Sequence, residues 1–408
     1  MRQFQKFLTY RFHIRGGNFK LFYSVLFGTT ILTYVDQVFV FLPNQILGFN
    51  WSGIAWIIAL LISLSILPKA KSSQFPLIFW MPWIVYLMFY AVIDFTFVGL
   101  QLTLQYLLPL IMGYLAATFK YSLHSLLWVL QGLTKATGFV FVLAIFYKLV
   151  FGYSPHMAAT PMFLLILACI SLGFYFFTNK IKYLVVFGLL FLMPFLNVTR
   201  MAMLVFGATF IGHFAHKRLS SRIGATLLGG LLLLGVLNSK GFQEKTFYDG
   251  SGGIDEIQFN YYDNSNLNSS GRKSWQDALA PGLKSAPIFG NGPRRDAALL
   301  GEVMGKQTGE AHNDYMSVRF NYGFVGLALL LFGFGTSFLK MYQMSRVNKH
   351  NVFQFLILTN LTLFIGFFFF MYSDNILKYT IWFPNYFFVL MGICFSINKI
   401  GFENEGRI

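Results

Sequence analysis

The sequence predicts an all-α membrane protein, and three observations lead to that prediction. Apolar residues make up 56% of the 408 residues and charged residues only 11%, whereas a soluble globular domain carries about 25% charged residues. Segments of about 17 to 25 apolar residues are long enough to cross a bilayer, and the chain contains about twelve candidates. Basic residues alternate between successive loops. We therefore expect a polytopic protein of about twelve transmembrane helices, with one long extracytoplasmic loop that forms a small helical subdomain.

The apolar segments follow one another along the chain. We place the spans at 21–42, 51–67, 76–95, 99–118, 133–152, 160–178, 183–197, 201–215, 223–238, 321–339, 354–372 and 381–397. The seventh and eighth are short and nearly continuous through Arg200. The first begins near Leu21 and lacks a small-residue cleavage site, so we interpret it as a span and not as a cleavable signal peptide.

Basic residues predict how the spans are oriented, because Lys and Arg are retained on the cytoplasmic loops of membrane proteins. The amino-terminal segment is basic, and so are alternate loops, at Lys69 and Lys71, Lys120, Lys180 and Lys182, Lys217 and Arg218, and Arg346 and Lys349. The opposite loops at 43–50 and 153–159 contain no Lys or Arg. We therefore expect both termini to be cytoplasmic and the long loop to lie on the extracytoplasmic side.

This orientation divides the chain into three parts. Residues 1–238 hold the first nine spans, residues 239–320 form the extracytoplasmic loop, and residues 321–408 hold the last three spans and a cytoplasmic tail. Loops as long as 239–320 are usually functional or folded. Trp275, Leu279 and Leu283 recur there at helical spacing, which predicts a helix whose apolar face lies on the membrane surface or a neighbouring span.

Composition and motifs exclude several classes of function. The formal charge of +16 is explained by basic residues beside membrane spans, and no soluble module carries a basic patch interleaved with aromatics, so nucleic acid is not expected as a partner. The two cysteines lie inside apolar segments, where a thiol behaves as a small hydrophobe. The sequence has no phosphate-binding loop, no His-Glu-x-x-His motif and no Gly-x-Ser-x-Gly elbow. We predict neither a metal nor a cofactor.

The stretch from Gly309 to Gly326 closes the long loop and leads into the tenth span. Its His312 is the candidate general base, because histidine titrates near neutral pH and can take a proton from a hydroxyl. Glu310, Asn313 and Asp314 are close enough in sequence that one of them could orient the imidazole. The alternative is a polar histidine at the membrane interface that has no catalytic role.

Arginines in three regions are candidates for an anion site. Arg200 lies between two apolar segments, where a charge costs about 2.5 to 3.5 kcal/mol at a helix centre and usually lines a polar cavity. A guanidinium there suits a phosphate, because it donates two parallel hydrogen bonds. Arg272 lies near a predicted helix start, where backbone N–H groups also favour anions. Arg294, Arg295 and Arg319 are weaker candidates, and the alternative for all five is a solvated or snorkelling charge.

Three separated pieces of the sequence resemble one family, the bacterial O-antigen ligase and surface-polysaccharide polymerase superfamily of multi-spanning glycosyltransferases. The pieces are Thr199-Arg200 before an apolar run, Gly271-Arg272 followed by Trp275, and Ala311-His312-Asn313-Asp314-Tyr315-Met316 followed by Tyr322-Gly323. The resemblance implies a glycan donor linked to undecaprenyl diphosphate, attack by an acceptor hydroxyl on the anomeric carbon, and inversion without a metal. It assigns the family's essential histidine to His312 and its two essential arginines to Arg200 and Arg272.

The resemblance leaves two activities open. A polymerase extends another lipid-linked repeat unit, whereas a ligase transfers the glycan to lipid A-core or to a protein hydroxyl. The form Ala-His-Asn-Asp-Tyr-Met with the following Tyr-Gly resembles polymerase members and favours assembly of O-antigen or exopolysaccharide. The more distant alternative is a polysaccharide transporter or flippase, which twelve spans would fit, although the two halves show no matching interrupted helices.

The same resemblance implies a location and a set of partners. We expect the bacterial cytoplasmic (inner) membrane, with the active site on its periplasmic side. The expected partners are the undecaprenyl diphosphate-linked glycan, an acceptor glycan or lipid A-core, and membrane lipids. A chain-length regulator is a further candidate partner.

Overall fold

The computed structural model describes residues 17–39, 41–46, 48–70, 73–157, 159–214, 219–252, 268, 272–304, 310–348 and 351–400. Its α-helices in these ranges are α2 (Gly17–Leu32), α3 (Val35–Val38), α4 (Trp51–Ile66), α5 (Leu77–Ile93), α6 (Phe97–Ala116), α7 (Leu123–Phe151), α8 (Ala159–Thr178), α9 (Ile181–Leu196), α10 (Arg200–Phe214), α11 (Leu219–Leu237), α12 (Lys240–Thr246), α13 (Arg272–Ser285), α14 (Arg295–Met304), α15 (Asp314–Val347), α16 (Asn351–Ser373) and α17 (Pro384–Ile400). The shorter elements are the 3-10 helices η2 (Leu67–Lys69) and η3 (Ile376–Lys378) and the strands β1 (Gln45–Ile46) and β2 (Phe49–Asn50).

A helix lies at each of the twelve predicted spans. Among the described residues, six helices are long and apolar enough to cross a membrane: α4 with η2, α6, α7, α8, α15 and α16. Shorter apolar helices are α5, α9, α10, α17 and residues 226–237 of α11. The chain is a multi-pass membrane protein, as its composition predicts. The all-α prediction is confirmed for the described residues, in which β1 and β2 form only a small antiparallel pair of two residues each.

The helix α7 is longer than the span predicted at 133–152, because it begins at a cap ahead of the apolar residues 126–130. It begins at Leu123, directly after the capping residue Ser122. The Ser122 side chain accepts a hydrogen bond from the backbone N–H of Ser125, and the Ser125 side chain accepts one from the backbone N–H of Ser122. This reciprocal cap fixes the start of the helix at Leu123.

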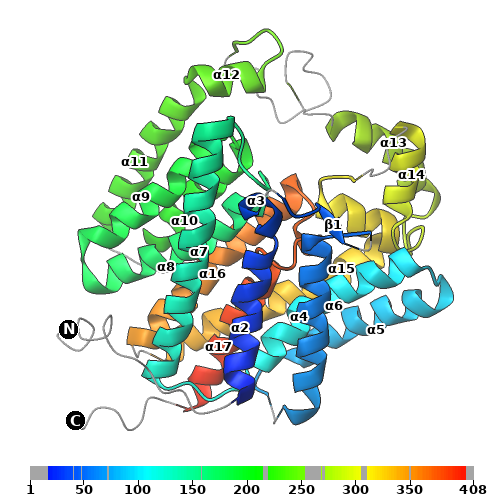
Figure 1. The fold of residues 1–408 in the computed structure, drawn as a ribbon, viewed down its shortest axis with the longest axis horizontal. Coiled ribbons are helices and arrows are strands. Elements are labelled where there is room, and N and C mark those ends of the chain that lie inside the picture. The colour runs from blue at the N-terminus through cyan, green and yellow to red at the C-terminus, as the bar shows by residue number, and fades with distance from the viewer. Residues whose placement is uncertain are drawn as a thin grey trace.

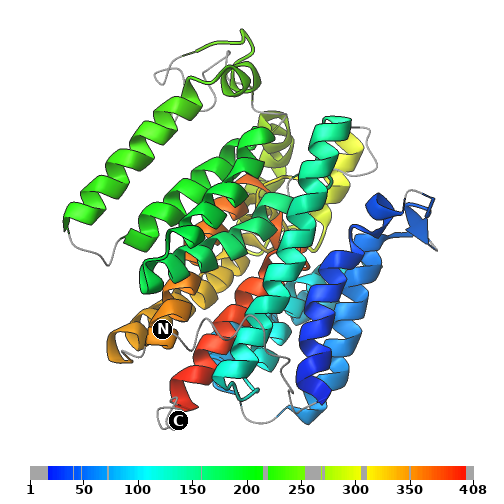
Figure 2. The same ribbon diagram turned by 60° about the vertical axis from the view of Figure 1, so that its left-hand side comes forward.

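The helices lie side by side in one bundle, and the short helices gather at one of its ends. Figures 1 and 2 show α12, α13 and α14 at this end, whereas α2 begins and α17 finishes at the opposite end. Inside the bundle, α17 packs along α6. A Cβ atom on Gly392 would lie 2.2 Å from the carbonyl oxygen of Gly113, so glycine is needed for the two backbones to approach this closely.

The long helix α15 is broken near its start, at Gly323, which has φ 67° and ψ −170°. Residues 287–292 lie against the break and satisfy its backbone groups. The N–H of Phe324 donates to the carbonyl of Pro287 (3.0 Å), and the N–H of Gly292 donates to the carbonyl of Asn321 (2.9 Å). Only glycine fits at position 323, because a Cβ there would lie 2.1 Å from the carbonyl oxygen of Ile288 and because φ is positive.

The helices α13 and α14 share a small apolar core with the start of α15. Leu279, Leu300, Ala311 and Phe320 are buried in it, and Trp275 packs against them. The predicted helix around Trp275 and Leu279 is therefore present as α13. Its apolar face packs against α14 and α15. Of the two predicted partners for that face, the structure shows the neighbouring span, because α15 contains the predicted tenth span.

Candidate functional site

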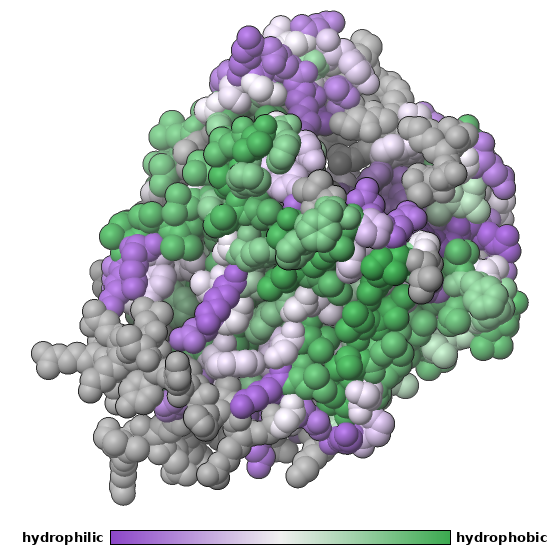
Figure 3. Space-filling model, viewed as in Figure 1, coloured by the Kyte–Doolittle hydropathy of each residue, from purple (hydrophilic) through white to green (hydrophobic). Residues whose placement is uncertain are grey.

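The end of the bundle that carries α12, α13 and α14 is rich in polar residues. Figure 3 shows apolar side chains over the middle of the bundle on this face, hydrophilic side chains at the α12 end, and a hollow bordered by hydrophilic residues. Residues 310–313 lie directly before α15, and Ala311 packs in the small core shared with α13 and α14. Asn313 caps α15, because its side chain accepts a hydrogen bond from the backbone N–H of Met316 (3.1 Å) in the manner of a preferred N-cap residue.

His312 pairs with a carboxylate that lies far away in the sequence. Its Nδ1 is 3.0 Å from Oδ1 of Asp374, in the turn after α16. A carboxylate only accepts hydrogen bonds, so Nδ1 carries the hydrogen and Nε2 is the acceptor nitrogen. The imidazole is 35% exposed and the Asp374 side chain 10%. The pair therefore presents a basic nitrogen to whatever enters the polar end of the bundle.

The Asp374 carboxylate is itself held in place. Its Oδ1 also accepts hydrogen bonds from the backbone N–H of Asn375 (2.8 Å) and from the hydroxyl of Tyr379 (3.4 Å). Sequence reasoning missed Asp374, because it searched for the partner of His312 only among nearby residues. A signal was present all the same: an acidic residue between the last two spans, on the side predicted to face outward.

Glu310 binds three donors from two other segments. It accepts from Arg294 (3.0 Å), from the side chain of Asn375 (2.9 Å) and from Lys378 (3.4 Å). Burial alone would raise the pKa of this carboxyl, but the charges of Lys378 and Arg294 and the hydrogen bonds from Arg294 and Asn375 hold it at about 2. Glu310 is therefore an anion at all physiological pH values, and its partners fix the backbone two residues before His312.

Asp314 makes a second connection to the same turn. It is fully buried, and its Oδ2 accepts a hydrogen bond from the backbone N–H of Leu377 (2.9 Å). Glu310 and Asp314 thus flank His312 and both bind the segment 375–378. This double connection sets where Asp374 stands relative to the imidazole, even though neither residue contacts the ring.

Arg200 is the first residue of α10, and its guanidinium is half-buried. Both Nη1 and Nη2 donate to the carbonyl of Asn268, at 3.1 Å each. A second cation lies near it: Lys245 donates to the carbonyl of Asn197 (3.1 Å), and burial followed by the charge of Arg200 lowers the pKa of Lys245. This region therefore concentrates positive charge at the start of α10.

Arg272 is the first residue of α13, and its side chain lies outside the described part of the structure. The helix α13 does reach His312 through Trp275, which lies one turn after Arg272. The centroids of the indole and imidazole rings are 4.8 Å apart, and the angle between the ring planes is 33°. The structure therefore brings the start of α13 to His312. Arg200 is hydrogen-bonded to Asn268, which lies four residues before Arg272 in the sequence.

The weaker arginine candidates have other partners. Arg294 pairs with Glu310, and Arg295 pairs with Asp94 of the α5–α6 turn (3.0 Å). Arg319 lies on α15 with its guanidinium over the ring of Phe324, 4.2 Å from the centroid. In the part of the chain that the structure describes, no three His, Cys, Asp or Glu side chains are grouped so that they could hold a metal ion.

These features define a multi-pass membrane protein with a polar site, built around a histidine–carboxylate pair, at one end of its bundle. Residues 185–331 match the O-antigen ligase family. The chain therefore carries an O-antigen ligase family domain, and this family implies an enzyme that transfers glycans. The matched region runs from α9 into α15, so it includes Arg200, Arg272 and His312 but ends before Asp374. No curated protein matches the chain.

Proposed function

We propose that this protein is a polysaccharide polymerase that transfers a glycan from undecaprenyl diphosphate to a sugar hydroxyl of an acceptor glycan. The observation that carries the proposal is the pair of His312 and Asp374, which leaves Nε2 of the imidazole as an acceptor inside a glycan-transferase family domain. A transferase of this kind needs a base for the hydroxyl and cations for the leaving diphosphate.

In the proposed reaction, Nε2 of His312 takes the proton of the acceptor hydroxyl while the oxygen attacks the anomeric carbon. The bond between that carbon and the diphosphate oxygen breaks, and the lipid diphosphate leaves with the electron pair. Asp374 stabilises the imidazolium that forms. Arg200 and Arg272 bind the diphosphate as negative charge builds on it. A single displacement of this kind inverts the anomeric configuration and needs no metal.

The remaining residues of the proposed site have supporting roles. Glu310 and Asp314 position the His312 segment against the turn that carries Asp374, and Asn313 starts α15. Arg319, which packs on Phe324, is not included in the site. The site faces the extracytoplasmic side in this proposal, since it lies at the end of the bundle opposite the start of α2 and the end of α17 and since the loops predicted to be cytoplasmic are basic.

The direct test is to incubate the purified protein with a repeat unit linked to undecaprenyl diphosphate and to separate the products by size. We expect a ladder of chains. His312→Ala, Arg200→Ala and Arg272→Ala are each expected to abolish the ladder while the protein still inserts into the membrane. Normal chain lengths at normal yield from all three variants would overturn the assignment of the site.

The same assay separates the alternative functions. The family description favours an O-antigen ligase as the second candidate, and a ligase would give one transfer onto lipid A-core instead of a ladder. If neither acceptor is modified but the labelled lipid crosses the membrane of a proteoliposome, the protein is a transporter or flippase.

A further inference from the structure

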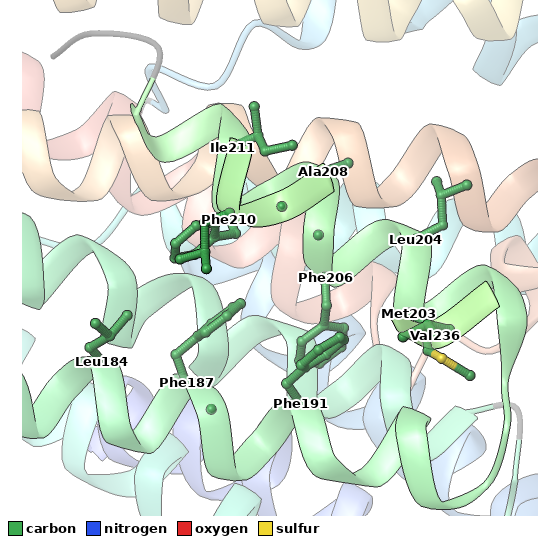
Figure 4. A pocket seen from close by; sticks show the side chains of 14 residues that line it. Leu184, Phe187, Phe191, Met203, Leu204, Phe206, Ala208, Phe210, Ile211 and Val236 are labelled. Atoms are coloured by element: carbon green, nitrogen blue, oxygen red, sulfur yellow. The ribbon is translucent and has the colours of Figure 1, made fainter. Parts of the chain in front are cut away.

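An apolar groove of about 440 Å³ lies between α9, α10 and α11. This volume is within the range of about 300 to 1,000 Å³ that is typical of ligand pockets. Figure 4 shows Phe187 and Phe191 of α9 pointing toward Phe206 and Phe210 of α10 across it. All its lining residues are apolar or glycine, so the groove suits a hydrocarbon chain and offers nothing to a sugar.

The groove has a closed floor and an open rim. Phe187, Met203 and Phe206 are buried and form the floor, whereas Leu204 of α10 and Leu228 of α11 are 42% and 49% exposed. Exposed side chains on these apolar helices face the hydrocarbon region of the bilayer. A chain can therefore enter sideways from the membrane without passing through water.

Positive charge lies at one end of the groove. Met203 is a lining residue and lies one helical turn from Arg200, which begins α10. Lys245 of α12 donates a hydrogen bond to the carbonyl of Asn197 (3.1 Å), three residues before Arg200. A bound molecule that matches both features has an anionic head at the outer end and an apolar chain that extends inward.

We propose that this groove binds the prenyl chain of the lipid-linked donor, with the diphosphate at Arg200. This inference rests on the proposed function, because that function supplies a donor with this combination of head and chain. A phospholipid acyl chain has the same apolar chemistry. It fits less well, because its single phosphodiester gives Arg200 and its neighbouring cations less charge to bind than a diphosphate does.

Two glycines make the groove open to a sharp test. A Cβ atom added at Gly188 or Gly207 would meet nothing within 4 Å, and both residues line the groove. Gly207→Leu and Gly188→Leu therefore place a side chain in the groove with no clash at Cβ, and leucine also favours a helix more than glycine does. Gly138→Leu is the matched control, since its Cβ likewise meets nothing and it lies on α7, which contributes no lining residue.

The experiment measures transfer from two diphosphate-linked donors with the same glycan, one on a farnesyl chain and one on an undecaprenyl chain. Filling the groove should raise KM for the undecaprenyl donor several-fold, because the displaced part of the chain exchanges close packing in the groove for looser contacts with surrounding lipid or detergent. The kcat should stay within about twofold, because binding of the chain is the same in the ground state and the transition state. The farnesyl donor and the Gly138→Leu variant should behave like wild type.

A binding measurement keeps the result clear if transfer fails. A photoactivatable undecaprenyl diphosphate should label peptides of α9 and α10 in wild type but not in Gly207→Leu. Unchanged KM and unchanged labelling in the filled variants would overturn the proposed groove. Labelling by a photoactivatable phospholipid that the prenyl diphosphate does not displace would overturn it too and would assign the groove to bulk lipid. A wild-type protein that is labelled but transfers no glycan would refute the proposed function and leave the groove in place.

Discussion

The pairing of His312 with Asp374 makes Asp374→Asn the most informative substitution. Asparagine has almost the same shape, so the turn after α16 should keep its fold. The substitution removes the charge that stabilises the imidazolium, and it allows the amide to donate to Nδ1, which would move the hydrogen to Nε2. A histidine with its hydrogen on Nε2 is no longer a base for the acceptor hydroxyl.

The size of the effect follows from the geometry. Two unit charges about 4 Å apart attract by about 4 kcal/mol at an effective dielectric constant of about 20. The imidazole is 35% exposed, so solvent screening reduces this to about 2 kcal/mol, or roughly 30-fold in rate. The wrong tautomer adds to that loss, and we expect kcat to fall by about 10² to 10⁴, the range of general base catalysis.

The assay is the initial rate of ladder formation at saturating donor, with equal amounts of folded protein verified by size-exclusion chromatography. Tyr379→Phe is the matched control, because it removes a longer hydrogen bond, 3.4 Å, to the same oxygen and leaves the charge. Its kcat should fall by no more than about tenfold, since a long hydrogen bond to a charged group contributes about 1.5 kcal/mol at most. A rate for Asp374→Asn within threefold of wild type would refute the role of this carboxylate.

Two further predictions concern the residues that hold the site together. The folded-state pKa of Glu310, about 2, lies below the ordinary value of 4.5, so its interactions stabilise the fold fully above pH 4.5 and are lost as the pH falls toward 2. Glu310→Gln should therefore lower the unfolding temperature at pH 7, by an amount equivalent to roughly 3 kcal/mol. When thermal unfolding is measured from pH 6 to pH 2.5, the difference in unfolding temperature between the variant and wild type should shrink as the pH falls. A difference that is constant with pH would contradict the ionic interactions of Glu310. Gly323→Ala should unfold the protein or lower its melting temperature strongly, because the new Cβ would lie 2.1 Å from the carbonyl oxygen of Ile288. The control is Gly335→Ala on the same helix, which should not have this effect because its Cβ meets nothing within 4 Å. Equal melting temperatures for the two variants would show that the break at Gly323 is absent.

The spans and part of the site could be predicted from sequence for the same physical reason. Apolar runs must form helices in a bilayer, because the backbone has no other hydrogen-bond partners there. A charge such as Arg200 next to such runs is costly and therefore noticeable. The break at Gly323 could not be predicted, because a glycine in a helical pattern is usually tolerated; the break depends on residues 287–292, which arrive from another part of the chain.

The same limit explains how sequence reasoning treated the charges near His312. Arg294 was predicted to be a weaker candidate for an anion site, of the same kind as Arg272. Its partner Glu310 lies sixteen residues away, and the two meet only once α14 has packed on α15. Pairing of this kind depends on tertiary structure, so a single sequence shows the charges without showing which of them cancel.

The position of Asp374 also bears on what the family domain contains. The match ends at residue 331, yet His312 takes its carboxylate partner from the turn after α16, and Glu310 and Asp314 both bind residues 375–378. A chain cut after α15 would keep Arg200, the start of α13 and His312, but the imidazole would lose the partner that sets its tautomer. In the proposed reaction, the matched region therefore supplies the histidine and the arginines. The turn between the last two helices supplies Asp374, the carboxylate that keeps Nε2 of the histidine free to accept a proton.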